Sequence, residues 1–166
     1  MPETLRIETE TLIMELESLD SAKRRVSALP EEVRQQLSPD WFEQLNSASA
    51  ATPWITGFSI RDRRTGEDVG SCGFKGPPAE GVAEIAYSIN TAHQGRGYAT
   101  RAAQALTDYA FSQEAIHVVC AHTLPSESAS TSVLKKCGFQ FCGNVEDPED
   151  GPVWRWEKRR KLDNSS

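Results

Sequence analysis

Apolar and polar residues alternate along residues 82–89, and this stretch is the starting point for predicting the fold. Such alternation is typical of a half-buried strand. From Ala99 onward the apolar residues recur at helical spacing instead, which predicts a helix. Gly95 and Gly97 stand between the two patterns, so the segment predicts a strand, a glycine turn and a helix. The strand's two faces carry Val82, Glu84, Ala86 and Ser88, and Ala83, Ile85, Tyr87 and Ile89.

The same patterns predict the remaining elements. Further strands are expected at residues 11–16, 54–61, 69–75, 117–122, 139–145 and 153–156. Helices are expected at residues 21–27, from Pro30 onward, and at 39–45, 99–113 and 126–137, the last closed by Gly138. Loops or turns are expected at residues 46–53, 61–67, 76–81 and 146–151, and a frayed tail at 159–166. This order predicts one α+β domain over residues 1–166, with helices packed on a sheet.

The composition adds limits on function. Of 166 residues, 38% are hydrophobic and 25% are charged, which is ordinary for a globular chain. The sequence has no long apolar run and no signal-peptide pattern, so we expect no membrane contact and a cytoplasmic location. The formal net charge of −6 argues against a nucleic-acid partner and suits a cationic amine.

The cysteines give no sign of a metal site. Cys72, Cys120, Cys137 and Cys142 lack the paired spacing of zinc ligands. We expect all of them to be reduced thiols, as is usual in the cytoplasm.

The glycine turn has the features of an anion site. The first turn of a helix carries unpaired amides and the positive end of the helix dipole. Gly95 and Gly97 lack a Cβ, so a phosphate or pyrophosphate could approach closely, with Arg96 at the rim. Thr100 replaces the third glycine of the dinucleotide pattern, and no lysine follows as in a P-loop. The alternative is a helix entry that only needs flexible residues.

Residues 94–99, Gln-Gly-Arg-Gly-Tyr-Ala, resemble the Gln/Arg-x-x-Gly-x-Gly/Ala pattern of the GNAT superfamily of N-acetyltransferases. A second similar segment covers residues 121–139, with Pro125, Ser130 and a helix that ends in Gly138-Phe139. Residues 9–13 resemble the start of the RimJ/RimL-like subgroup, although Thr11 stands where an arginine is usual. The resemblance spans most of the chain and implies a mixed, mostly antiparallel sheet flanked by helices.

The resemblance also implies acetyl-CoA as co-substrate, with no metal. Its pantetheine would pair with the edge of the strand at residues 82–89, and an amide near Ile89 or Asn90 would meet the oxyanion. Glu127 stands where the family has an asparagine, and an ionised carboxylate accepts hydrogen bonds but cannot donate them. The predicted cofactor-binding residues are Ile89, Asn90, Gln94, Gly95, Arg96, Gly97, Tyr98, Ala99, Thr100 and Glu127.

The resemblance implies that two side chains are catalytic, because related enzymes often have a glutamate, and some have a serine, at these places. Glu84 is the expected general base; the alternative is a strand carboxylate bonded to a neighbour. Ser130 is the expected acid for the leaving thiolate; the alternative is a residue that caps or begins a helix. Related enzymes often use a tyrosine as acid, but the sequence has none after Tyr109.

Other aromatic and imidazole side chains have weaker interpretations. Tyr87 is interpreted as a core residue and Tyr98 as loop packing, while His117 and His122 are interpreted as structural. His93 could shuttle a proton, although an exposed loop histidine usually has no such role. Candidates to line an acceptor pocket are Trp41, Phe42 and Trp54, for which core packing is the alternative.

The sequence therefore predicts an N-acetyltransferase that works by direct transfer in a ternary complex. The acceptor would be a primary amine, either a protein N-terminus or a small molecule, and the chain a monomer or homodimer. The alternative is a non-catalytic acyl-CoA sensor or interaction module on the same fold.

Overall fold

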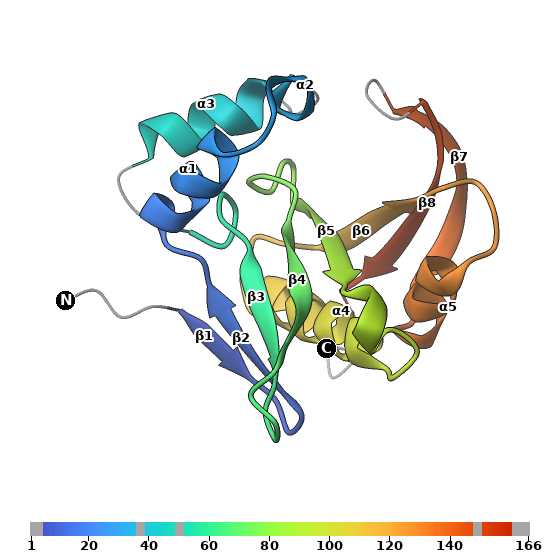
Figure 1. Cartoon of the computed structure of the whole chain (residues 1–166). Helices are drawn as coiled ribbons and strands as arrows, with labels where there is room; N and C mark the ends of the chain where they lie inside the picture. Colours follow the sequence, from blue (N-terminus) through green and yellow to red (C-terminus); the bar gives the residue numbers. More distant parts are fainter. Residues whose placement is uncertain (1–4, 36–38, 49–51, 148–150, 161–166) are drawn as a thin grey trace.

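The structure is a computed structural model, which describes residues 5–35, 39–48, 52–147 and 151–160. Its centre is an eight-stranded sheet in the order β1-β2-β3-β4-β5-β6-β8-β7 (Figure 1). Among the described strands, β5 and β6 are the one parallel pair. The strands are β1 (Arg6–Glu8), β2 (Leu12–Leu16), β3 (Phe58–Asp62), β4 (Asp68–Phe74), β5 (Val82–Ile89), β6 (Val118–Thr123), β7 (Gln140–Asp147) and β8 (Gly151–Arg159). The helices are α1 (Leu19–Ser27), α2 (Glu31–Arg34), α3 (Pro39–Ser47), the 3-10 turn η1 (Thr91–His93), α4 (Tyr98–Phe111) and α5 (Ala129–Lys136).

The predicted fold class is confirmed: a mixed, mostly antiparallel sheet is flanked by helices. α4 lies against one face of the sheet (Figure 1). Its inner side consists of small or branched apolar side chains, so the helix axis approaches the strands closely. Ala102, Ala103, Leu106 and Ala110 are completely buried there.

Three local predictions are wrong. β1 was not predicted, because three residues carry too little alternation to be recognised. Residues 54–57 form a turn instead of a strand, with the amides of Ile55 and Thr56 bonded to the Thr52 carbonyl. Tryptophan is common in strands, which explains the prediction. Here the Trp54 ring packs against Phe74 instead, with the ring centroids 4.6 Å apart.

The third correction concerns the start of the predicted tail. β8 continues to Arg159, and the Arg160 guanidinium donates hydrogen bonds to the carbonyls of Gln113 and Ile116. These contacts hold the chain against the end of α4 as far as residue 160. The expected fraying of residues 161–166, and parts of the loops at residues 49–51 and 148–150, lie outside the described residues.

The sheet opens between its two parallel strands. β5 and β6 pair at Val82–Val118, Ala83–Val119 and Glu84–Cys120, and their register ends there. Beyond that point β5 stays with β4 as far as Ile89, whereas β6 stays with β8 as far as Thr123. We call the resulting V-shaped opening the β5–β6 notch.

Helices α1 to α3 form a cap above one end of β2–β4 (Figure 1). Their contact is a small second core of Ala22, Val26 and Leu45. The Trp41 indole fixes this cap to the turn before β3 by donating a 2.9 Å hydrogen bond to the Ile55 carbonyl. Within the described part of the chain, no helix combines the length and apolar character needed to cross a membrane.

Candidate active site

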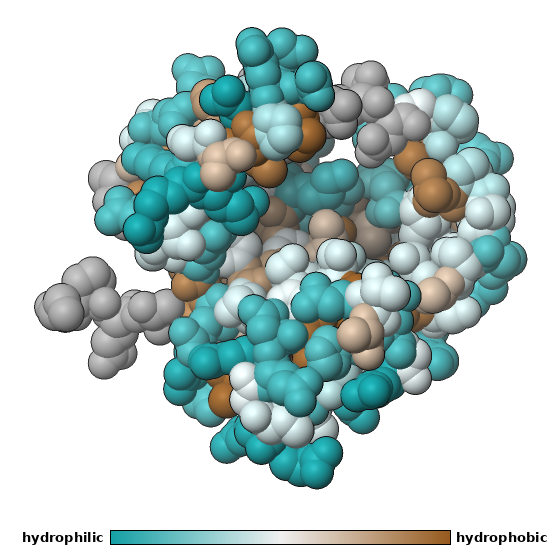
Figure 2. Space-filling view, viewed as in Figure 1, coloured by the Kyte–Doolittle hydropathy of each residue, from teal (hydrophilic) through white to brown (hydrophobic). Residues whose placement is uncertain are grey.

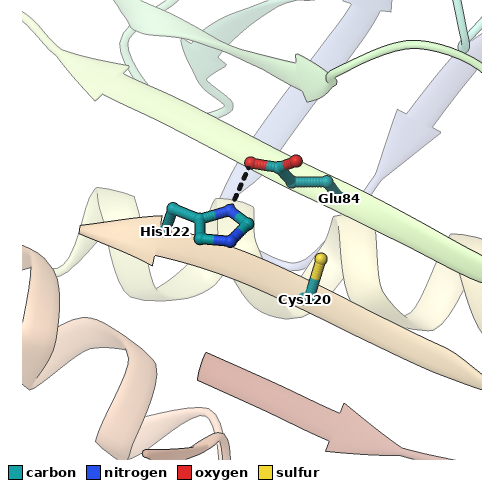
Figure 3. Close-up of side chains that lie close together, drawn as sticks. All are labelled: Glu84, Cys120 and His122. Atoms are coloured by element: carbon teal, nitrogen blue, oxygen red, sulfur yellow. Dashed lines mark hydrogen bonds and ion pairs between the residues drawn. The ribbon is translucent and has the colours of Figure 1, made fainter. Parts of the chain in front are cut away.

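Glu84 and His122 meet across the β5–β6 notch. The His122 Nδ1 lies 2.8 Å from Glu84 Oε2 (Figure 3). The Lys75 ammonium lies 3.4 Å from the same oxygen. The side chains of Glu84 and His122 are 24% and 15% exposed, so water screens this contact only partly. Glu84 therefore has a bonded neighbour, as expected if it were only a structural strand carboxylate, and its role as the base stays a prediction.

Sequence reasoning missed His122 and Lys75 as members of this site. His122 stands two residues beyond Cys120, so it shares a sheet face with Glu84 once the Glu84–Cys120 register is known. Lys75 follows β4, and its amide donates to the Glu84 carbonyl. Both positions depend on strand pairing, which residue patterns alone did not supply.

The two predicted catalytic side chains line one small cavity of about 110 Å³. Glu84 contributes from β5 and Ser130 from the first turn of α5, together with His122, Lys75 and Tyr87. Ser128, and not Ser130, caps α5, in a reciprocal box with Thr131. The Ser130 hydroxyl is therefore not required for capping.

Tyr87 lies at this cavity and is only partly buried, so its interpretation as a core residue was incomplete. Its phenol donates a 3.2 Å hydrogen bond to the Ser130 carbonyl. Burial raises the pKa of Tyr87 to about 12, so the phenol stays protonated at neutral pH.

A larger groove of about 1450 Å³ adjoins the cavity and shares Glu84, Lys75 and Tyr87 with it. Figure 2 shows it as a hollow between the helical cap and the sheet. Of the aromatic candidates for an acceptor pocket, Trp41 lines this groove. Trp54 instead packs against Phe74 and Tyr109, and the partly exposed Phe42 is not among the lining residues.

The glycine turn lies beyond the far end of β5. Gly95 and Gly97 have φ of +80° and +87°, and Gly97 is the N-cap of α4. A Cβ at Gly95 would meet nothing within 4 Å, and one at Gly97 would meet only Arg101, at 3.7 Å. Within the described chain, the amides of residues 95–100 donate no hydrogen bond to a protein acceptor. The turn therefore presents open backbone donors at a helix N-terminus.

The residues around these donors have fixed structural contacts. The Gln94 amide group donates to the Ile89 carbonyl at 3.0 Å. The Tyr98 side chain is buried, and its hydroxyl donates to Asp62 at 2.5 Å, which anchors the start of α4. This bond holds the pKa of Asp62 below its ordinary value. Ala99 and Thr100 follow in the first turn of α4.

The edge of β5 offers donors inside the notch. The Asn90 amide bonds to the Val69 carbonyl of β4 at 2.9 Å, so that amide is already used. Because partners alternate along an antiparallel pair, the amides of Tyr87 and Ile89 point away from β4, into the notch. Of the two predicted oxyanion positions, Ile89 is the one whose amide points into the notch.

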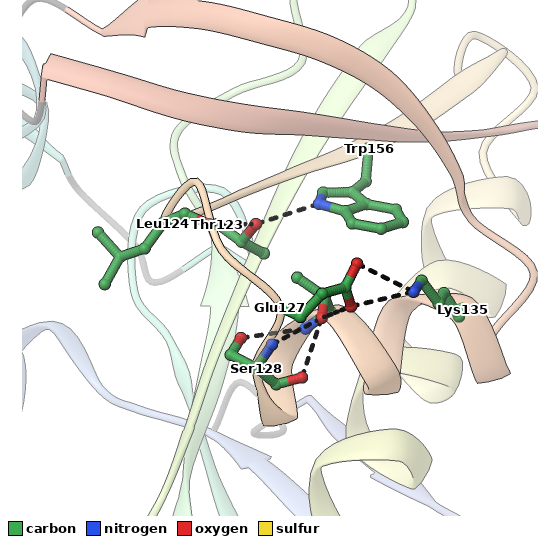
Figure 4. Close-up of polar contacts among 7 residues, drawn as sticks. Thr123, Leu124, Glu127, Ser128, Lys135 and Trp156 are labelled. Atoms are coloured by element: carbon green, nitrogen blue, oxygen red, sulfur yellow. Dashed lines mark hydrogen bonds and ion pairs between the residues drawn. The ribbon is translucent and has the colours of Figure 1, made fainter.

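Glu127 precedes α5, and its carboxylate bonds to side chains of that helix. It accepts from the Thr131 hydroxyl at 3.0 Å and from the Lys135 ammonium at 3.0 and 3.2 Å (Figure 4). The Lys135 contact, followed by Thr131, lowers the pKa of Glu127. A cofactor contact by this carboxylate therefore stays a prediction, and it would compete with these bonds.

The other two histidines lie elsewhere. The His93 ring stacks edge-on to Tyr98 at 6.2 Å, and its Nε2 lies 3.6 Å from Glu67. The His117 ring packs against Gly81. Neither histidine lines the small cavity.

Glu84, Cys120 and His122 bring possible metal ligands together, with ligand atoms within 4.8 Å of one another (Figure 3). Two features oppose a cation there. The Lys75 ammonium already faces Glu84, and burial raises the pKa of the Cys120 thiol to about 11. The absence of a metal stays a prediction. Cys72, Cys120, Cys137 and Cys142 are all free thiols.

Comparisons with known proteins find relatives among N-acetyltransferases. The uncharacterized N-acetyltransferase p20 of Bacillus licheniformis is 37% identical over 93 residues, which cover 55% of this chain and 52% of p20. The uncharacterized N-acetyltransferase YjdG of Bacillus subtilis is 28% identical over 149 residues, which cover 82% of this chain and 88% of YjdG. The match thus spans only about half the length of p20.

Solved structures share the fold. The coenzyme A complex of RimL, a ribosomal L7/L12 alpha-N-protein acetyltransferase, superimposes with a TM-score of 0.66 at 18% identity. The superposition covers 93% of this chain and 98% of RimL. The family model described as an acetyltransferase (GNAT) domain matches residues 6–140. The chain therefore belongs to the GNAT acetyltransferase family.

Proposed function

We propose that this protein transfers the acetyl group of acetyl-CoA directly to a primary amine in a ternary complex. The observation that carries the proposal is the placement of two features along one strand. β5 has Glu84 at the apex of the notch, and the open amides of residues 95–100 follow its far end. Glu84 and Ile89 are about 17 Å apart along the strand, which an extended pantetheine arm can span.

The cofactor would lie along the notch. Its pyrophosphate would accept from the amides of residues 95–100, with the Arg96 and Arg101 side chains at the rim. Its pantetheine amides would pair with the open edge of β5 near Ile89. Gln94 would act indirectly, because its side chain is bonded to the Ile89 carbonyl.

The reaction would proceed at the small cavity. The acceptor ammonium loses a proton to Glu84, and the free amine attacks the thioester carbon. The Tyr87 amide, which also points into the notch and lies at the cavity, would stabilise the oxyanion as the C–N bond forms, since Ile89 is too far from Glu84 to do so. The C–S bond then breaks, the attacking nitrogen loses its second proton, and the leaving thiolate gains one through Ser130 or solvent. Glu84 returns the first proton to water.

The acceptor would enter through the larger groove. Its 1450 Å³ exceed the roughly 300–1,000 Å³ of an ordinary small-ligand pocket, so a peptide N-terminus fits as well as a small amine. Its lining carboxylates outnumber its basic side chains and favour a cationic acceptor. The carboxylates are Glu15, Glu17, Asp68, Glu84 and Asp147, against Arg25 and Lys75.

Two further assignments belong to this proposal. RimL acts on a protein N-terminus according to its description, and the start of this chain resembles the RimJ/RimL-like subgroup. An N-terminal amine is therefore one of the two acceptor classes to test, beside small-molecule amines. The free thiols suit the cytoplasmic location that we predict.

The test has two parts. Saturating acetyl-CoA should raise the melting temperature, since a ligand at 100 times its Kd stabilises by about 2.7 kcal/mol. A panel of peptides and small amines should then release CoA thiol with at least one acceptor. Binding without turnover on any amine would favour the acyl-CoA sensor, and no binding at millimolar acetyl-CoA would contradict both functions.

A further inference from the structure

We infer that His122 is a positioning residue for the base. Its Nδ1–H holds one carboxylate oxygen of Glu84 and leaves the other oxygen free to take the proton of the acceptor amine. This inference rests on the proposed function, because it requires Glu84 to be the base. It assigns a role to a histidine that neither the sequence patterns nor the comparisons identified.

The geometry divides the two carboxylate oxygens of Glu84 between two tasks. His122 Nδ1 at 2.8 Å and Lys75 Nζ at 3.4 Å both approach Oε2. Within the described structure, Oε1 has no hydrogen-bond partner, and Glu84 lines both the small cavity and the groove. Oε1 is thus the oxygen that an entering amine, or a water that it binds, can reach.

The protonation of the ring follows from its partner. An ionised carboxylate can only accept hydrogen bonds, so the imidazole nitrogen facing it carries the proton. This holds for the neutral ring and for the imidazolium, since Nδ1 donates in both. His122 therefore donates the same hydrogen bond to the ionised Glu84 whichever charge its ring carries.

The surroundings keep the imidazole in place. His122 pairs with Arg155 in the β6–β8 ladder, and its side chain is 15% exposed. Cys120 precedes His122 by two residues in β6 and lies on the same face of the sheet. The Arg155 guanidinium donates a 2.7 Å hydrogen bond to Glu157 of β8. The charged and titratable groups around Glu84 are thus Lys75 from β4, Cys120 and His122 from β6, and Arg155 and Glu157 from β8.

Loss of the hydrogen bond between His122 and Glu84 should lower kcat more than it weakens the binding of acetyl-CoA. Without Nδ1 the Glu84 side chain can take other rotamers, and a displacement of about 1 Å at a reacting group can cost about 100-fold in rate. We expect H122A to lower kcat by about 10- to 100-fold, with the KM for acetyl-CoA changed less than about twofold. The turn at residues 94–100, which would bind the pyrophosphate, does not contact His122.

The discriminating variant is H122N. An asparagine amide nitrogen can replace Nδ1 as donor to Glu84, but it supplies no second ring nitrogen. We expect H122N to recover most of the activity that H122A loses. In an E84Q background, H122A should add little further loss, because both changes remove the same function. H117N is the matched control, since His117 lies outside the cavity, and it should keep wild-type kcat.

Each outcome decides the inference. Wild-type kcat in H122A would make His122 merely structural and overturn it. An H122N variant as slow as H122A, with an unchanged acetyl-CoA-induced melting shift, would overturn it too, because the imidazole itself would then move the proton. The E84Q single variant tests the proposed function separately: full activity there removes Glu84 as base, whatever the histidine variants do.

Discussion

Glu84 and Cys120 are the last residues at which β5 and β6 remain in register, and the sheet opens directly beyond them. β5 continues beside β4 while β6 continues beside β8, so the two strands follow different neighbours. Backbone donors that would otherwise form a ladder therefore face an opening. A bound amide-bearing chain can complete that ladder, with the Glu84 carboxylate at its inner end.

The glycine turn should control cofactor affinity. In G95A the new Cβ would project from a residue at φ +80° into the open space that the diphosphate needs. We expect the KM for acetyl-CoA to rise roughly tenfold, equivalent to about 1.4 kcal/mol, with kcat little changed. Steady-state kinetics measured against acetyl-CoA concentration would check this.

A matched glycine separates backbone strain from ligand contact. Gly66 also has a positive φ, of +77°, and open space around its Cβ position, but it lies in the β3–β4 turn. G66A should lower the melting temperature about as much as G95A and leave the KM unchanged. Equal KM values for G95A and the wild type would contradict the anion-site assignment.

The bond between Tyr98 and Asp62 predicts a pH-dependent stability. The pKa of Asp62 is lowered from its ordinary 3.8 and that of Tyr98 is raised from 10.0, each first by this hydrogen bond. A carboxyl group whose pKa is lowered by folding stabilises the protein at pH values above its pKa in the unfolded state. That stabilisation is lost as pH falls through its pKa in the folded state. A phenol whose pKa is raised by folding stabilises the protein at pH values below its pKa in the unfolded state. That stabilisation is lost as pH rises through its pKa in the folded state.

The wild type should therefore have a higher melting temperature than Y98F between about pH 4 and pH 10. The difference in melting temperature should shrink below and above this pH range. Phenylalanine keeps the buried ring, so packing changes little. Melting temperatures of both proteins across pH would provide the measurement. A difference that does not vary with pH would mean that the hydroxyl contributes only through packing.

Thiol reactivity should follow burial. Cys72, Cys120 and Cys137 are buried and Cys142 is exposed. Burial raises the pKa of Cys72 to about 12 and that of Cys120 to about 11, which suppresses their reactive thiolates. A disulfide reagent at pH 8 should label Cys142 quickly in the native protein and all of the cysteines after denaturation. Rapid native labelling of Cys120 would contradict its placement.

Acetyl transfer should not need a metal ion. Lys75 faces the Glu84 carboxylate and the Cys120 thiol is protonated, so the Glu84, Cys120 and His122 group is poorly prepared for a cation. Prior dialysis against a chelator should leave kcat unchanged. A loss that zinc restores would instead assign these residues to a metal site.

The sequence predicted the part of the site that lies within one continuous segment. Alternation from Val82 to Ile89, Gly95, Gly97 and the helical spacing after Ala99 are local signals, and the structure has the strand, turn and helix they predict. Glu84 was proposed as the base from its place in this strand together with the resemblance to related enzymes. These features need no knowledge of which strands become neighbours.

The partners of Glu84 could not be predicted in this way. His122 and Lys75 reach it only through the register of β5 with β6 and β4, which depends on long-range packing. Trp54 shows the opposite error: its β-prone side chain indicated a strand, yet its packing on Phe74 stabilises a turn. In the first case the needed information is non-local, and in the second a tertiary contact overrides a local preference.

The most direct measurement of the central claim is the turnover of E84Q beside its affinity for acetyl-CoA. Glutamine keeps the shape of the side chain but cannot take a proton from an ammonium ion. We expect kcat at least about 100-fold below the wild type at neutral pH, with an unchanged Kd for acetyl-CoA. A wild-type kcat in E84Q would show that the proton leaves by another route and that the notch is not organised around this carboxylate.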